Sequence, residues 1–110
     1  MPTVSANSTQ TVVTITNSMT ATGNSTDIVN CPIRATACQA TVVGSGSVSA
    51  TVNLQASLDS SYWKTIKTFT LSGTTSDTDI ALLDATFQFY RVNVSAISGT
   101  SATVTVLLKT

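Results

Sequence analysis

The clearest pattern of hydrophobic and polar positions lies in residues 47–58, SVSATVNLQASL, where the two kinds of side chain alternate. A period of two places successive side chains on opposite faces of a β-strand, and no helical phase accounts for it. One face of the predicted strand carries only Ser, Thr, Asn and Gln. The face predicted to be buried carries Val48, Ala50, Val52, Leu54, Ala56 and Leu58.

Two more segments alternate and predict two further strands. In residues 102–109, Leu107 is an apolar exception on the polar face. In residues 87–97, Phe87, Phe89 and Ile97 share the second face with Arg91, so we expect that face to be covered as well. The predicted core faces carry Ala102, Val104, Val106 and Leu108 in the first segment, and Tyr90, Val92, Val94 and Ala96 in the second.

Turn-forming residues separate the predicted strands at regular intervals. GSGS at 44–47 and DSS at 59–61 each end a strand, and SGTS at 98–101 predicts a hairpin. SGTTSDTD at 72–79 indicates a surface loop. Further strands are expected at 9–16 and 35–43, and IALLD at 80–84 is a short strand or a bend.

These elements predict an all-β fold: a two-sheet antiparallel β-sandwich of seven to eight strands, with Greek-key or jelly-roll connections. A closed barrel is the second choice. The abundance of Thr and Val agrees, because branched side chains pack well on a pleated surface. We expect a single domain over residues 1–110, with residues 1–8 as a flexible N-terminal arm.

The only tryptophan, Trp63, begins a predicted returning strand at 62–71, in phase with Phe69 and Leu71. Ile66 is out of that phase, which predicts a bulge or a second covered face. Adjacent strand residues point to opposite faces, so Tyr62 and Trp63 cannot form one stacking platform. We expect Trp63 to close the end of the sandwich, in preference to a ligand role, and Tyr62 to lie at the surface or an interface.

The charge balance argues against nucleic acid and membrane partners. Five basic residues balance five acidic ones, and charged residues make up 9% of the chain, which leaves no strong electrostatic footprint. The first residues lack the features of a secretory signal, and no apolar run reaches the about 20 residues of a membrane helix. We therefore expect synthesis in a cytosol.

Catalytic chemistry is poorly supplied, since the chain has no His and no Glu. We predict that it is not an enzyme and that it needs no cofactor or metal. Asp77 and Asp79 could approach Ca²⁺, but aspartates are common in turns. Cys31 and Cys38 fit neither a CxxC redox motif nor a zinc site, and we favour two buried thiols over a disulfide.

The surface favours assembly with other protein. With a mean hydropathy of +0.29 and few charges, the predicted strands have weak protection against association. Arg91 beside Phe87 and Phe89 could form a cation–π surface, for which a subunit contact is better supported than a ligand. We expect much of the surface to be buried in an assembly.

Residues 50–66 and 89–108 resemble a pattern in small structural proteins of tailed bacteriophages. In that pattern an alternating strand ends in Gln-x-Ser-x-Asp, a turn and a Trp follow, and an Arg-x-Asn-Val strand leads to a Ser-Gly pair. Ser60 stands where the pattern usually has glycine. The matching residues are Gln55, Ser57, Asp59, Trp63, Arg91, Asn93, Val94, Ser98 and Gly99.

The resemblance implies a virion structural protein of the capsid decoration or cement type. Such a protein binds the major capsid protein on the outside of the shell, commonly as a homotrimer, and bridges adjacent capsomers. Many weak contacts then combine in one oligomer. Two alternatives stay open: a carbohydrate-binding or adhesin module of a tail fibre or baseplate, and a head–tail structural subunit.

Overall fold

The computed structural model describes residues 12–25, 28–30 and 34–109, which form seven strands of one antiparallel sheet. No helix within these ranges is long and apolar enough to span a membrane. The predicted arm at 1–8 lies outside the described residues. The strands are β1 (Val12–Met19), β2 (Gly23–Asn24), β3 (Val29–Asn30), β4 (Ala35–Ser57), β5 (Lys64–Gly73), β6 (Ser76–Ala85) and β7 (Phe89–Lys109).

Two long strands organise the sheet. β4 and β7 pair antiparallel over nearly their whole length, from Ala37 opposite Lys109 to Ser57 opposite Phe89. β6 pairs with the first part of β4 and β5 with the second, while β1 pairs with the last part of β7 and β2 and β3 with the first. Each long strand therefore has different neighbours along its first and second parts.

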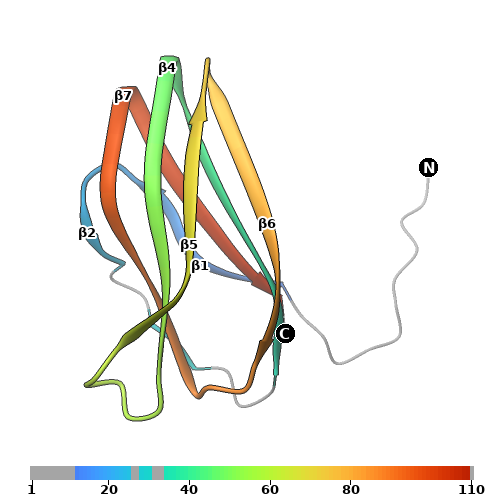
Figure 1. The fold of residues 1–110 in the computed structure, drawn as a ribbon. Coiled ribbons are helices and arrows are strands. Elements are labelled where there is room, and N and C mark those ends of the chain that lie inside the picture. The colour runs from blue at the N-terminus through green and yellow to red at the C-terminus, as the bar shows by residue number, and fades with distance from the viewer. Residues whose placement is uncertain (1–11, 26–27, 31–33, 110) are drawn as a thin grey trace, which may run out of the picture.

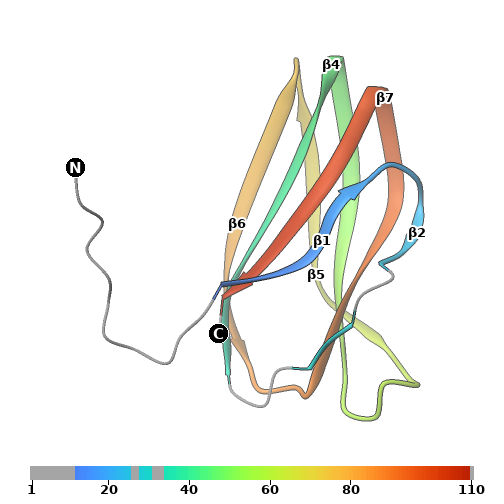
Figure 2. The ribbon, with the colours of Figure 1, turned by 180° about the vertical axis from the view of Figure 1, so that it is seen from behind.

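The sheet is folded over across its middle. Figures 1 and 2 show β4 and β7 turning over at one end of the molecule, where β5 also passes into β6. We call the part made of β1, β6, residues 35–43 and residues 103–109 the β6 half. The part made of β2, β3, β5, residues 48–57 and residues 89–98 is the β5 half.

The all-β, antiparallel prediction is confirmed, but two separate sheets are not found in the described part of the chain. The predicted turn at 44–47 and hairpin at 98–101 do not end a strand. Gly46 has φ +81°, Gly99 φ +121° and Ser101 φ +55°, and the β4–β7 register shifts beside them. Such bulges bend a strand without ending its pairing, so the turn residues produce a fold in a continuous ladder.

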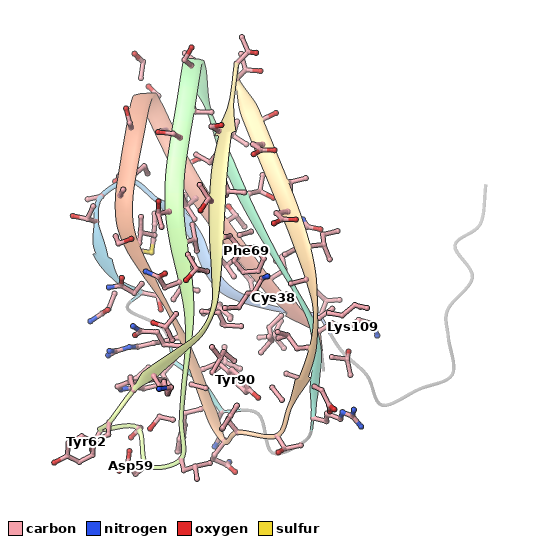
Figure 3. All side chains as sticks on the ribbon, in the orientation of Figure 1. Cys38, Asp59, Tyr62, Phe69, Tyr90 and Lys109 are labelled. Atoms are coloured by element: carbon pink, nitrogen blue, oxygen red, sulfur yellow. The ribbon has the colours of Figure 1, made fainter. Side chains whose placement is uncertain are left out.

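One side of the sheet forms a single apolar core. Buried positions alternate along β4 and β7 as predicted, and the largest fully buried side chains are Tyr90 and Phe69. Figure 3 places both between the strands. Because residues of both halves are buried in the same cluster, the inner faces of the two halves cover each other. The core from these halves contains Val42, Val52, Leu54, Val92, Val94, Val104, Val106 and Leu108 among others.

Two residues predicted for the core lie outside it. Leu58 is 72% exposed because β4 ends at Ser57 and the chain turns away there. Ala96 is exposed and Ile97 packs against the core instead. The cause is a register shift between Thr51 and Val52, which moves the neighbouring stretch of β7 into the other phase.

The predicted loop at 72–79 is also wrong. Only the short stretch between Gly73 and Ser76 is a turn, and residues 76–85 form the edge strand β6. The predicted short strand or bend at 80–84 is thus the second part of a longer strand. Of the polar residues that suggested a loop, Ser76, Thr78 and Asp79 occupy exposed positions of this edge, and Asp77 is half-buried.

Candidate docking surfaces

The outer face of the β6 half carries rows of side chains that cross four strands. Residues directly opposite in an antiparallel pair share a face. Val12 pairs with Lys109, Lys109 with Ala37, and Ala37 with Leu82. In the next row Thr14 pairs with Leu107, Leu107 with Gln39, and Gln39 with Ile80. The apolar outer face, as we name it, consists of Val12, Ala37, Ile80, Leu82 and Leu107.

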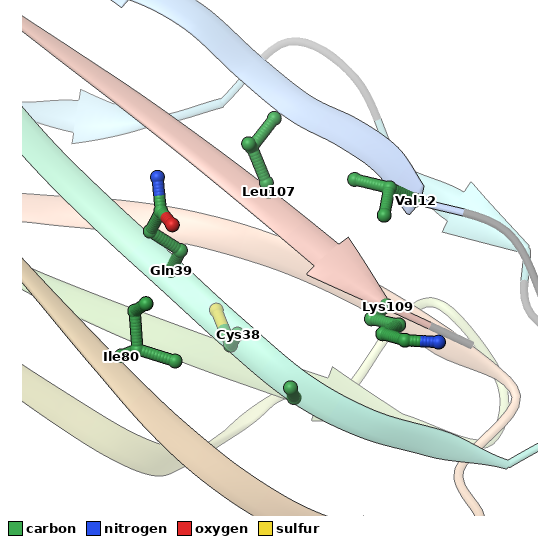
Figure 4. Close-up of a pocket in the computed structure, with 7 residues that line it drawn as sticks. Val12, Cys38, Gln39, Ile80, Leu107 and Lys109 are labelled. Atoms are coloured by element: carbon green, nitrogen blue, oxygen red, sulfur yellow. The ribbon is translucent and has the colours of Figure 1, made fainter. Parts of the chain in front are cut away.

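This surface is both apolar and open. Leu82 is 90% exposed and Ile80 61% exposed. A groove of about 200 Å³ runs across the face, with Lys109 at one end (Figure 4). The predicted exception at Leu107 is explained, because its side chain lines this groove. A face of this kind offers a partner apolar contact area with one cation at its rim.

The outer face of the β5 half is polar and satisfies its own hydrogen bonds. The Thr68 hydroxyl donates to the side-chain oxygen Oδ1 of Asn53 (2.9 Å), and Asn53 Nδ2 donates to Asn93 Oδ1 (3.2 Å). Asn93 Nδ2 donates in turn to Asn24 Oδ1 (2.8 Å). This series of hydrogen bonds crosses β5, β4, β7 and β2 and holds the four strands together. The four side chains bond one another, so they do not form a cluster of unpaired polar groups directed at a ligand.

Trp63 lies on the polar side of the β5 half and does not close the core. It precedes β5, is half-buried, and carries the Arg91 guanidinium 4.4 Å from its ring centroid. Arg91 Nε also donates to Gln55 Oε1 at 2.7 Å. The expected phase with Phe69 fails because the register shifts between Thr65 and Lys67, which confirms the bulge predicted at Ile66.

The cation–π contact of Arg91 is therefore with Trp63, and not with Phe87 or Phe89. Phe87 packs edge-on against Tyr90, with the ring centroids 6.5 Å apart, and the Tyr90 hydroxyl accepts a hydrogen bond from the Phe87 amide at 3.2 Å. The aromatic residues of this segment thus stabilise the approach to β7.

The loop between β4 and β5 is organised by one carboxylate. Asp59 Oδ1 accepts hydrogen bonds from the amides of Ser61 (2.9 Å) and Tyr62 (3.0 Å) and from the Ser57 hydroxyl (2.8 Å). These bonds, the Tyr62 amide first, hold the pKa of Asp59 below its ordinary value. Ser60 has φ +60°, the left-handed conformation that glycine favours.

Tyr62 is a surface residue, as predicted. It is 84% exposed at the tip of the loop, where Figure 3 shows its ring pointing away from the body of the molecule. The neighbouring Trp63 is covered on one side by Arg91. Both residues precede β5, so the alternation of a strand does not apply to them, but Tyr62 is exposed while Trp63 is half-buried against Arg91.

Cys38 is a buried free thiol, in agreement with the prediction for this residue. Burial raises the pKa of the thiol to about 12, so it is protonated at neutral pH. Cys31 lies outside the described residues. Cys38 is thus a small apolar residue of the core.

The carboxylates of Asp77 and Asp79 bind backbone amides. Asp77 Oδ1 accepts from the Thr78 amide and Oδ2 from the Ser72 amide, each at 2.9 Å, and Asp79 Oδ1 accepts from the Ile80 amide at 2.9 Å. Within the described ranges no three Asp, Glu, Cys or His residues gather as a metal site would require. An ion pair joins Arg34 and Asp84 further along β6.

Ile80 and Leu82 are the residues that sequence reasoning missed. Their spacing of two was a signal that they share a face, but only the pairing with Ala37 and Gln39 shows that this face is the outer one. Compared with family models, with curated proteins and with solved structures, the chain matches none of them.

Proposed function

We propose that this chain is a non-enzymatic virion protein that decorates the capsid of a tailed bacteriophage and docks through its apolar outer face. The observation that carries the docking step is the exposure of Ile80 and Leu82 beside a groove on one face of the sheet. The capsid as partner rests on the sequence resemblance. The proposal uses the single folded sheet of the structure, and not the two-sheet sandwich with Greek-key or jelly-roll connections that the sequence predicted.

The residues that carry the resemblance fit a scaffold role. Gln55, Arg91 and Trp63 form one stack, and Ser57 and Asp59 hold the adjacent loop. These residues contact one another and lie away from the apolar outer face. The shared pattern would then specify the fold, and the docking face would vary with the partner.

The mechanism is a mechanical one. A protein that binds only the expanded capsid stabilises that state by mass action. We propose a homotrimer, made in the host cytoplasm and placed on the capsid surface, whose copies each contact the major capsid protein. Linking the copies turns later contacts into intramolecular ones, which raises avidity without any new contact area.

Co-sedimentation with purified phage fractions tests the proposal. The chain is mixed separately with expanded capsids, with unexpanded procapsids and with tails, and bound protein is measured after centrifugation. We expect binding to expanded capsids. Binding to tails alone would contradict it and would favour a tail-fibre carbohydrate-binding module or a head–tail subunit.

Substitutions on the two outer faces locate the docking surface. Leu82→Lys and Ile80→Lys place a cation on the apolar outer face and should weaken capsid binding by at least about tenfold. Thr70→Lys adds the same charge on the exposed outer side of β5 and is the matched control. Equal binding by all three variants, with unchanged melting temperatures, would rule out this face as the docking site.

A further inference from the structure

The outer edge of β6 is long and regular. Among the described strands β6 pairs with β4 alone, and residues 76–82 pair with residues 37–43 without a register shift. Proteins usually protect such an edge with a bulge, a proline, a lysine or an inward charge. The stretch 76–82 has no proline, no lysine and no bulge; its charges are Asp77 and Asp79, which lie opposite the buried Val42 and Ala40 and therefore on the inner face.

The backbone donors on this edge can be identified from the pairing. The Gly44 amide donates to the Thr75 carbonyl at 2.8 Å. The backbone N–H and C=O groups of the even-numbered residues in this part of β4 therefore point toward β6. The Thr78 hydroxyl donates to the Ala40 carbonyl at 3.1 Å, which agrees. Backbone groups alternate in direction along a strand. The amides of Thr78, Ile80 and Leu82 therefore point away from β4.

Two of these three donors are occupied by carboxylates of the same strand. Asp77 accepts from the Thr78 amide and Asp79 from the Ile80 amide, each at 2.9 Å. Asp77 also accepts from the Ser72 amide on β5. A partner strand would need these same amides, so it would have to displace both carboxylates.

The side chains beside these donors are apolar and exposed. Ile80 and Leu82 project from the outer face of the edge, and the residue before Leu82 is an alanine, which has no acceptor to offer. The edge thus combines regular backbone with apolar surface, which is the combination that favours addition of another strand.

We propose that the β6 edge is a self-association surface for a second copy of this chain, and that Asp77 and Asp79 keep it closed by occupying its donors. In an antiparallel pairing that places Ile80 opposite Leu82 of the second copy, Asp79 lies opposite Leu83 and Asp84 opposite Thr78. No aspartate then faces another aspartate. Four apolar side chains, Ile80 and Leu82 from each copy, meet on one face.

This self-association is independent of the capsid and is tested with the purified chain. Sedimentation velocity over a range of concentrations compares wild type, the double variant Asp77→Ala/Asp79→Ala, and Asp84→Ala. Asp84→Ala removes a charge from the same strand, but its carboxylate pairs with Arg34, and no backbone amide of the described residues donates to it. Circular dichroism confirms that each variant is folded.

We expect the double variant to form larger species at a concentration about tenfold lower than wild type, because the edge donors are released. Asp84→Ala removes a charge from the same pairing but releases no donor, so it should change association far less than the double variant does. Adding Leu82→Lys to the double variant should return it to the wild-type state, because a lysine on the edge opposes strand addition.

Three results would overturn the proposal. One is a folded double variant that sediments as wild type. The second is equal association by Asp84→Ala, which would assign the effect to charge alone. The third is continued association after Leu82→Lys is added, which would place the contact elsewhere. If the double variant does not fold, Asp79→Ala alone carries the same test, because it leaves the Ser72–Asp77 bond intact.

Discussion

Replacing Gly99 by alanine tests whether the fold in the sheet depends on the backbone of β7. Gly99 has φ +121°, which residues with a side chain rarely adopt. An added Cβ would lie 2.8 Å from the Ser47 carbonyl oxygen and 2.9 Å from Val48 Cγ1, both on β4. The substitution therefore strains the backbone and forces two paired strands apart.

The expected loss of stability is the sum of these two effects. A residue held in a sparsely populated backbone region costs about 1–3 kcal/mol. Forcing extra atoms into packed surroundings costs about 1–3 kcal/mol. We therefore expect Gly99→Ala to lower the free energy of unfolding by about 4 kcal/mol.

Gly46→Ala is the matched control. Gly46 also has a positive φ, +81°, but an added Cβ would meet no atom within 4 Å. Only the conformational cost remains, about 1–2 kcal/mol. Both variants replace a glycine by an alanine in the same bend, so their difference isolates the close approach of β7 to β4.

Urea unfolding at a fixed protein concentration measures both values, since assembly would shift the apparent stability. In thermal unfolding, Gly99→Ala should melt about 10 °C or more below Gly46→Ala. Equal losses in the two variants, or a Gly99→Ala protein as stable as wild type, would refute the idea that close packing fixes the bend.

Three further outcomes follow from single groups. Tyr90→Phe removes the acceptor of the Phe87 amide and should cost about 1–3 kcal/mol in urea unfolding; an unchanged midpoint would contradict the role of that bond. Because the pKa of Asp59 is lower in the folded chain than in the unfolded one, its stabilising effect is complete above the unfolded value of about 4 and is lost as the pH falls through the folded value. Asp59→Asn should thus flatten the pH dependence of stability below about pH 4, and an unaltered dependence would exclude this carboxylate. In a Cys31→Ser background, Cys38 should resist alkylation at pH 8 until urea unfolds the chain, because its pKa is raised to about 12; rapid labelling of the folded protein would show that the thiol is accessible.

The local alternation of the sequence predicted most of the core. Val52 and Leu54 are buried because a period of two leaves little freedom in choosing the inner face. The fold across the sheet was not predictable in this way. Gly46 and Gly99 suit a tight turn as well as a bulged bend, and the distinction depends on pairing with a distant strand.

The candidate docking surface was likewise predictable in its local pattern and unpredictable in its long-range pairing. Leu107 was recognised as an exception on a polar face, but its neighbours in space, Ile80 and Val12, are far from it in the sequence. Trp63 was assigned to the wrong face although the bulge at Ile66 was predicted, because a bulge reverses the phase of everything beyond it. Non-local register was the missing information in both cases.

The central position of β7 has a consequence for how the chain matures. β7 pairs with β1, β2, β3 and β4, and it follows all four of them in the described part of the chain. Its pairing of Lys109 with Val12 joins nearly opposite ends of the described chain, and pairings so distant in sequence form slowly. Among the described strands, β1, β2 and β3 therefore have no ladder partner until β7 is present, whereas β4, β5 and β6 can pair with one another without it, so docking of the first three strands should be a late step in folding.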